Sequence, residues 1–391
     1  MRAVSVNEFT GAQLRRLCAA IGLAHRAEEA QAVLADVLGP TGTRSLAEPP
    51  PWGSDIADDH SPVEYSVAFE EDGSHTLRLL VEAGAYKPGP RANLAAALAA
   101  LDRLADRYPV ALDKLDRVRD LFLPDDPQGL FALWFSIVVR GDRPPMVKIY
   151  LNPLVRGADR ADELVATGLD RLGFTGSFDW ISRHTPRGEA GLDQFSFFAL
   201  DLEETEAARV KLYQSHYRAG ARDAQLAAGA TEAADTDRIA EFTSMVGGDG
   251  PFLSRPLVSS HTFLASDSAR PKGYSLYVPV RDYVHDDAEA LTRVRAMLTR
   301  YGVDDSALRR AVRAVTDRDL ESGVGLLAHV SLRMGPPRPG VTVYLSAEAY
   351  EVAPRGASAP RARPDPRGDA QDPGSTTSGC WKEEGAPTTC R

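Results

Sequence analysis

The chain has 391 residues, of which 43% are hydrophobic and 26% are charged, as in an ordinary globular protein. Its net charge of −10 argues against a general binder of nucleic acid or anionic membranes, so an anion site would need a local concentration of basic residues. No apolar run approaches the roughly 18 residues that span a membrane, and the N-terminal residues show no signal-peptide pattern. Cys18, Cys380 and Cys390 form neither a disulfide framework nor a metal-ligand spacing, which favours a cytoplasmic protein.

Helical stretches alternate with hairpins along the chain. Residues 4–37 carry apolar residues at helical spacing, and Asp304 and Asp305 are candidate N-caps for the last helical stretch. The later helical stretches are 91–106, 155–172, 234–246, 284–301 and 305–317. Pairs of strand-like runs joined by short polar connections are typical of β-hairpins. The pairs are 62–70 with 75–83, 129–139 with 146–152, 194–202 with 208–214, 258–266 with 273–280, and 325–334 with 340–346.

The C-terminal segment differs from the rest of the chain. Residues 354–391 are rich in Pro, Gly, Ser and charge, and they have too few apolar side chains to offset the entropy of ordering. We therefore expect a single domain over residues 1–353, followed by a disordered tail. Trp381 and the two tail cysteines could instead dock on another surface.

A tyrosine recurs in register in four of the hairpins. The segments VKIYLNP, RVKLYQS, YSLYVPV and VTVYLSA carry Tyr150, Tyr213, Tyr277 and Tyr344, at spacings of 63, 64 and 67 residues. Five hairpins of this kind would supply ten antiparallel strands. Such strands, with helices outside them, can close into a barrel with no free edges and a lumen wide enough for a ligand. An open α+β sheet or two sandwiches explain the regular spacing less well.

Alternation along these strands separates a basic and tyrosine-bearing face from an apolar face. The apolar set is Ile149, Val210, Leu212 and Leu276, and the polar set is Lys148, Tyr150, Arg209, Lys211, Tyr213, Ser275 and Tyr277. The apolar face must meet the outer helices, so the polar face is predicted to point inward. Together with Arg78 from the first hairpin, it would form a cationic ring that is costly without a compensating anion. A diphosphate suits these donors.

The tyrosines and Glu64 indicate which groups could be stabilised beside that anion. A cation near an aromatic ring gains about 0.5–2 kcal/mol per ring, so several tyrosines could shield an allylic carbocation from water. Glu64 shares the inward face of its strand with Ser66, where a carboxylate could accept an indole N–H and stabilise the positive charge that develops during attack. Alternatively, Glu64 could neutralise one of the lysines.

The acidic doublets do not form the DDxxD motif of magnesium-dependent diphosphate chemistry. These doublets are Asp58-Asp59, Asp125-Asp126, Asp286-Asp287 and Asp304-Asp305. Protein cations would replace the metal in this protein, so no metal or other cofactor is expected to be required.

These segments together resemble the dimethylallyltryptophan synthase family of indole prenyltransferases, and in particular its compact bacterial tryptophan prenyltransferases. The resemblance covers about residues 10–352 in the segments SPVEYS, TLRLLVE, VKIYLNP, ARVKLYQ, YSLYVPV and TVYLS. It implies an α+β fold called the ABBA barrel, with ten antiparallel strands inside a ring of helices. It also implies that Glu64 binds the indole N–H. The diphosphate would be bound by Arg78, Lys148, Arg209 and Lys211, and the tyrosine shield would be Tyr150, Tyr213, Tyr277 and Tyr344.

The sequence departs from the family pattern at two points. Ser275 stands where members often have glutamine, which removes a long diphosphate donor. The strand before VKIY lacks the lysine that some fungal members use as the final base. Trp134 on that strand is either an acceptor-pocket wall or a core residue. His329, the departing diphosphate or a water are therefore the candidate bases.

The expected reaction is transfer of a dimethylallyl group from dimethylallyl diphosphate to an indole carbon of L-tryptophan or a related indole. Carbon 6 is favoured over carbons 5 and 7 on the resemblance alone. The alternatives are another arene, such as tyrosine, a naphthalene or a cyclic dipeptide, and a non-catalytic barrel that binds a phosphorylated metabolite. We expect no nucleic-acid or membrane partner, and a monomer or a weak homodimer.

Overall fold

The computed structural model describes residues 4–356, apart from 71, 266–268 and 336–338. The predicted tail lies outside the described residues from residue 357 onward. Ala353–Pro354 (β12) pairs with Gly323–Val324 (β9) in a small separate sheet. None of the helices in the described part of the chain is long and apolar enough to span a membrane.

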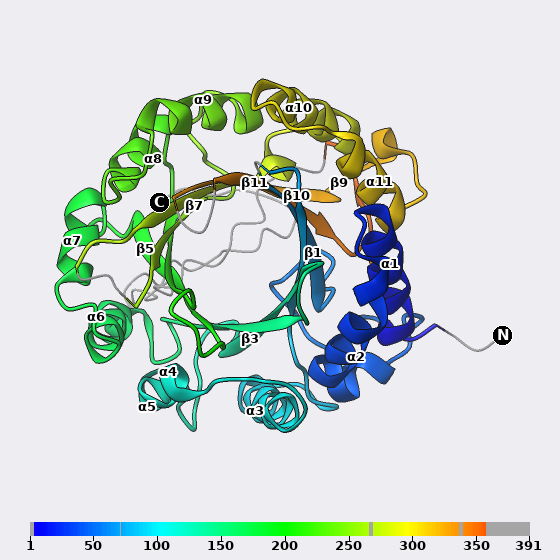
Figure 1. The fold of residues 1–391 in the computed structure, drawn as a ribbon, viewed down its shortest axis with the longest axis horizontal. Helices are drawn as coiled ribbons and strands as arrows, with labels where there is room; N and C mark the ends of the chain where they lie inside the picture. The colour runs from blue at the N-terminus through cyan, green and yellow to red at the C-terminus, as the bar shows by residue number, and fades with distance from the viewer. Residues whose placement is uncertain (1–3, 71, 266–268, 336–338, 357–391) are drawn as a thin grey trace, which may run out of the picture. The chain divides into compact units, whose positions relative to one another are not determined.

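Ten antiparallel strands close into one barrel, which confirms the predicted fold (Figure 1). Their order around the barrel is β1-β11-β10-β8-β7-β6-β5-β4-β3-β2. The strands are β1 Val63–Glu70, β2 His75–Val81, β3 Leu133–Val139, β4 Met146–Leu151, β5 Asp193–Asp201, β6 Val210–His216, β7 Leu257–Phe263, β8 Gly273–Val278, β10 Leu327–Met334 and β11 Gly340–Ser346. Pairing of β1 with β11 joins the first hairpin to the last, so these barrel strands leave no open edge.

Helices surround the barrel, and two or more of them precede each hairpin (Figure 1). They are α1 Val6–Ala20, α2 Ala27–Leu38, α3 Pro90–Arg107, α4 Asp113–Asp116, α5 Arg119–Phe122, α6 Ala161–Arg171, α7 Ser177–His184, α8 Ala221–Ala228, α9 Thr236–Gly247, α10 Asp287–Arg300 and α11 Ser306–Val315. Short 3-10 turns lie at Ala24–Arg26, Gly39–Thr43, Ala158–Arg160, Val280–Asp282 and Leu320–Ser322. A unit of two or three helices followed by a hairpin therefore occurs five times.

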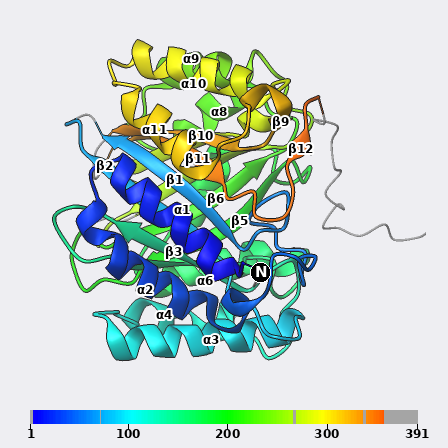
Figure 2. The ribbon, with the colours of Figure 1, turned by 90° about the vertical axis from the view of Figure 1, so that its right-hand side faces the viewer.

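The main apolar core lies between the barrel and the helices. The outward residues Ile149, Val210 and Leu276 are at most 1% exposed and belong to this core. Burial of side chains of this size stabilises the fold by roughly 1.5–3 kcal/mol each. Helix α1 lies against β1 (Figure 2), where the Tyr65 hydroxyl donates to the Thr10 carbonyl at 2.8 Å. The inward face of the strands is thus left for polar residues, as the alternation predicted.

Several predicted boundaries were wrong. Strand β3 begins at Leu133 and not at residue 129, because Gly129 turns the chain at a φ of 79° and the Asn152 amide holds the Phe131 carbonyl at 2.7 Å. Helix α6 begins at residue 161, after a turn at Gly157, which has a φ of 99°. The short helices α4, α5, α7 and α8 were not predicted. Each has too few turns to show a clear period in the sequence.

All five hairpin turns lie at the same end of the barrel, because the strands are antiparallel and the chain enters and leaves every hairpin at the opposite end. We call this the hairpin end. The opposite end, where the chain passes to and from the helices, is the helix end. Inward residues early in β4 and β6 are therefore near the hairpin end, and those early in β1 and β3 are near the helix end.

Candidate active site

One cavity inside the barrel brings together every residue that the sequence predicted for the diphosphate and its shield. It encloses about 460 Å³, including space open to solvent. The predicted residues that line it are Arg78, Lys148, Tyr150, Arg209, Lys211, Tyr213, Ser275, Tyr277 and Tyr344. The cavity is also lined by Ser136, Val138, Ser331, Arg333 and Thr342, which are not among the predicted residues. The structure places these side chains together, while their roles stay predictions.

Basic residues gather toward the hairpin end of this cavity. Lys148 and Lys211 lie near the starts of β4 and β6, and both are nearly inaccessible to solvent. The Lys148 ammonium donates to the Tyr150 hydroxyl at 3.2 Å and to the Tyr213 hydroxyl at 3.1 Å. Lys211 donates to the Tyr277 hydroxyl at 3.4 Å. Neutral hydroxyls thus orient the two ammonium groups and leave their charge uncompensated.

Two carboxylates balance part of the charge. Asp201 accepts from the Arg209 guanidinium at 2.6 Å, and Glu70 pairs with Arg333. The cavity is lined by five cations, which are Arg78, Lys148, Arg209, Lys211 and Arg333. Among the described residues, Asp201 and Glu70 are the carboxylates found in ion pairs with them. The formal excess is three positive charges, which favours a multiply charged anion such as a diphosphate.

The crowded cations lower one another's pKa. Burial, and then the charge of Lys211, holds the pKa of Lys148 well below its usual value. Burial, and then the charges of Arg209 and Arg333, does the same to the pKa of Lys211. Burial would also lower the pKa of Arg209, but the Asp201 carboxylate raises it overall. An anion in the cavity would relieve this repulsion and raise the pKa of both lysines.

A belt of tyrosines lies one step further toward the helix end. The ring centroids of Tyr150 and Tyr213 are 5.7 Å apart, those of Tyr213 and Tyr277 are 5.8 Å apart, and those of Tyr277 and Tyr344 are 5.9 Å apart. The Lys148 ammonium already lies 4.4 Å from the Tyr150 ring centroid. The four tyrosines found by their sequence spacing therefore form a continuous aromatic wall, which can stabilise a second cation next to an anion.

Further aromatic rings lie beside the tyrosine belt, since Trp134 pairs with Tyr150 and Phe197 pairs with Tyr213 across neighbouring strands. Phe197 makes edge contacts with Tyr150 and Tyr213, at centroid distances of 5.9 Å and 5.7 Å. Trp134 lies 5.7 Å from Phe197 and stacks on Phe131 at 4.0 Å, with 19° between the ring planes. Trp134 is thus an inward residue that joins the aromatic lining, and not a residue of the outer core.

Glu64 lies on the inner face near the start of β1, between Leu80 and Ser346 of the neighbouring strands. It is 6% exposed, and none of the described residues pairs with its carboxyl group. Burial, and then the negative charge of Asp58, raises the pKa of Glu64 to about 8. Glu64 therefore does not neutralise a lysine, and its acceptor oxygens face the lumen.

His329 lies on the inner face of β10 at the helix end, with its ring 6.2 Å from that of Tyr344. Its Nδ1 accepts a hydrogen bond from the Arg281 guanidinium at 3.2 Å. Arg281 in turn pairs with Asp58 at 3.0 Å. The lone pair of Nδ1 is therefore already used in this hydrogen bond.

The site residues that sequence reasoning missed are of two kinds. Arg333 shares strand parity with Ser331 and His329, so alternation alone could have placed it in the lumen. The partners Asp201 and Glu70 carried no such signal, because a carboxylate at a strand end is usually solvated. No three or more His, Cys, Asp or Glu side chains within the described ranges form a group that could hold a metal ion.

This arrangement defines a class of enzyme. A buried anion site, an aromatic wall and a carboxyl group aligned along one barrel suit the ionisation of an organic diphosphate and capture of the resulting cation. That is the chemistry of aromatic prenyltransferases.

Comparison with known proteins agrees with this class. The family model for tryptophan dimethylallyltransferase matches residues 29–221. A crystal structure of 6-dimethylallyltryptophan synthase from Micromonospora olivasterospora, in complex with DMASPP and Trp, is 50% identical with a TM-score of 0.86, and the match covers 90% of this chain and 100% of that one. The 5-dimethylallyltryptophan synthase of Streptomyces coelicolor is 38% identical with a TM-score of 0.83, over 90% and 100% of the two chains.

A curated relative, deoxybrevianamide E synthase from Aspergillus versicolor, is 28% identical over 194 residues. That match covers 43% of this chain and 44% of the relative. The chain belongs to the tryptophan dimethylallyltransferase family and is a transferase, as the sequence resemblance predicted.

Proposed function

We propose that this protein transfers a dimethylallyl group from dimethylallyl diphosphate to an indole carbon of L-tryptophan or a closely related indole. The observation that carries the proposal is the order of groups along the lumen. An excess of cations, the tyrosine belt and the Glu64 carboxyl follow one another from the hairpin end to the helix end. Relatives up to 50% identical are named as dimethylallyltryptophan synthases, which supports the same substrates here.

The reaction begins at the cation layer. The five cations and the hydroxyls of Tyr150 and Tyr277 would hold the diphosphate and stabilise its negative charge as the allylic C–O bond breaks. The bonding electron pair leaves with the diphosphate, and the allylic cation that remains lies against the tyrosine belt. Each ring lowers the energy of that cation by about 0.5–2 kcal/mol, and the belt keeps water from capturing it.

The indole attacks the cation from the helix end. Glu64 would accept the indole N–H, which directs electron density into the ring and stabilises positive charge on the nitrogen as the new C–C bond forms. A proton must then leave the attacked carbon. Because the Nδ1 of His329 accepts from Arg281, we favour the departing diphosphate as the base, with the Nε2 of His329 as the alternative.

We propose carbon 6 as the position of attack. The supporting observation is the higher identity to relatives named as 6-dimethylallyltryptophan synthases, 50% and 48%, than to the 5-dimethylallyltryptophan synthase, 38%. Trp134 would form the wall that sets the acceptor orientation.

No metal is needed in this scheme, because protein cations supply the positive charge that magnesium supplies elsewhere. We expect turnover to persist in EDTA.

The test is incubation with L-tryptophan, dimethylallyl diphosphate and EDTA, followed by mass spectrometry and NMR of any product. A mono-dimethylallylated tryptophan supports the proposal, and NMR identifies the substituted carbon. Lys211→Met serves as the matched inactive control, since it removes a donor-binding cation without changing the helix end. Absence of product with tryptophan, but product with another arene or a longer donor, would favour the alternative acceptors. Diphosphate binding without any turnover would favour a binding protein.

A further inference from the structure

Glu82 is a second buried carboxyl group at the helix end, and it is not among the residues predicted from the sequence. It follows the last residue of β2, and strand alternation places it on the same face as Arg78 and Leu80. Its backbone N–H donates to the Pro62 carbonyl at 2.9 Å, which extends the β1–β2 pairing by one step. The side chain is 4% exposed. Glu82 thus lies just beyond Glu64 on the neighbouring strand.

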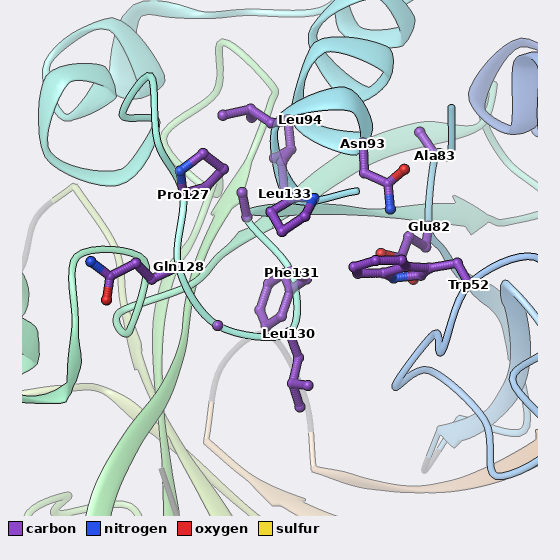
Figure 3. Close-up of a pocket in the computed structure, with 13 residues that line it drawn as sticks. Trp52, Glu82, Ala83, Asn93, Leu94, Pro127, Gln128, Leu130, Phe131 and Leu133 are labelled. Atoms are coloured by element: carbon purple, nitrogen blue, oxygen red, sulfur yellow. The ribbon is translucent and has the colours of Figure 1, made fainter. Parts of the chain in front are cut away.

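Two tryptophan side chains lie beside this carboxyl group. Val81 pairs with Phe135, so Glu82 stands next to Trp134 on β3. Trp52 reaches it from the loop before β1, and Figure 3 shows Glu82 and Trp52 on the same side of a small cavity next to α3. Burial raises the pKa of Glu82 to about 7, and the hydroxyl of Ser54 and both indole N–H groups oppose that rise. All three groups are therefore close to the carboxyl.

The same cluster contains unsatisfied polar atoms. The Oε2 of Glu82, the Nε1 of Trp52 and the Nε1 of Trp134 are all buried, and none has a well-aligned hydrogen-bond partner among the described residues. Leaving such groups unpaired in a low-dielectric interior is costly. One acceptor group between two donors can satisfy all three, because a carboxylate offers two oxygens and each indole offers one N–H.

Trp134 is the member of this cluster that faces the reaction. One face of its indole stacks on Phe131 at 4.0 Å, and the ring also lies 5.7 Å from Phe197, which contacts the tyrosine belt. Stacking fixes the ring plane but permits rotation within that plane. A hydrogen bond at Nε1 removes this remaining freedom.

We propose that Glu82 is a positioning residue, whose carboxylate bridges the indole N–H groups of Trp52 and Trp134 and so fixes the wall that decides which carbon of the acceptor meets the allylic cation. The effect on the acceptor rests on the proposed function, whereas the hydrogen bonds from Trp52 and Trp134 to Glu82 do not depend on it. No bond to substrate is formed or broken by Glu82.

The bridge can be tested without turnover. The chain has four tryptophans, so ¹⁵N-labelled protein gives at most four indole N–H signals, and single Trp→Phe variants assign them. Glu82→Ala should move the signals of Trp52 and Trp134 upfield through loss of a hydrogen bond. The Trp180 signal, whose N–H donates to the Ala230 carbonyl at 2.9 Å, should stay in place. Glu48→Ala is the matched control, because Glu48 is an exposed glutamate in the loop before β1 that also carries Trp52. This change should move none of the indole N–H signals.

The effect on specificity is tested with the active enzyme. Glu82→Ala should raise the KM for the acceptor several-fold, leave the KM for the donor unchanged, and give a mixture of ring isomers. Glu82→Gln keeps one acceptor oxygen and should retain most of the single product. In a Trp134→Phe background, Glu82→Ala should have no further effect on the isomer ratio.

Two results would overturn the inference. One is a Glu82→Ala protein with unchanged Trp52 and Trp134 signals. The other is an isomer ratio that responds to Glu82→Ala as strongly in the Trp134→Phe background as in the wild type. Failure of the proposed function is a different outcome, since the wild type would then give no prenylated tryptophan while the signals still report the bridge.

Discussion

Replacement of Glu64 by glutamine removes the titratable carboxyl group and its charge, but it keeps the size of the side chain and one acceptor oxygen. Glu64 is 6% exposed and its pKa is raised from 4.5 to about 8, chiefly by burial. A rise of this size corresponds to roughly 5 kcal/mol of penalty on the ionised form in the folded protein. The ionised carboxylate that we propose as the acceptor of the indole N–H therefore forms only on the alkaline side of neutrality in the empty cavity.

The expected activity follows from that titration. At saturating donor, the kcat/KM for the acceptor should rise with pH to a plateau above about 8, and it should fall roughly tenfold per pH unit below that value. Glu64→Gln should lack this profile. Its kcat/KM at pH 8.5 should be lower by on the order of 10²–10³, because the neutral amide does not stabilise the positive indole nitrogen. Steady-state kinetics with liquid chromatography of the product measures both effects.

The same titration affects stability with a defined sign. The folded state holds a proton that the unfolded chain releases between pH 4.5 and about 8. The stability linked to Glu64 is therefore complete below pH 4.5 and is lost as the pH rises through 8. Glu64→Gln should raise the Tm more at pH 9 than at pH 5. Glu48→Gln, at an exposed position, should not. A flat activity profile from pH 6 to 9 together with wild-type turnover by Glu64→Gln would refute the reasoning.

The remaining predictions concern the cation layer and the outer core. Lys211→Met should weaken diphosphate binding by about 1–3 kcal/mol, and the wild type should take up protons on binding, because an anion raises the depressed pKa of both lysines. Calorimetry in buffers of different ionisation enthalpy measures both quantities. EDTA should leave turnover unchanged, as product quantification will check. His261→Leu should stabilise the fold between pH 6.5 and 3, because burial lowers the pKa of this histidine to about 3, and acid unfolding by circular dichroism measures the change.

Each of these predictions has an outcome that would contradict it. Binding of diphosphate without proton uptake would contradict the titration of the two lysines. Loss of turnover in EDTA that magnesium restores would contradict metal-independent transfer. For His261, a buried residue with no hydrogen-bond partner for either ring nitrogen among the described residues, the sign is that stability falls as the pH falls below 6.5. His285→Leu, at a side chain that is 60% exposed, is the matched control. Equal acid stability of both variants would argue against the assignment.

The polar face of the barrel was predictable because its information is local. Alternation along a strand is a property of neighbouring residues, so Lys148, Tyr150 and Tyr213 could be assigned to one face without knowledge of any contact. The helix-facing residues followed by the same rule. Boundaries were less accurate, since Gly129 and Gly157 bend the chain where the hydrophobic pattern continues.

The partners of these residues were not predictable from the sequence. Glu70 and Arg333 are 263 residues apart, and barrel closure alone brings them together. Glu82 drew no attention in the sequence, because a glutamate after a strand is usually solvated, whereas in the folded chain residues from distant segments, Trp52 and Trp134 among them, lie around it.

The sequence by itself thus determined the order of the five hairpins, four of the five inward cations, the four inward tyrosines, and the family. The tertiary structure decided which charges are paired, how the tyrosines join into a belt, and how far burial shifts the pKa of Glu64 and the lysines. The physical reason is that side-chain direction depends on neighbouring residues, whereas ion pairing and desolvation depend on distances that only the closed barrel sets.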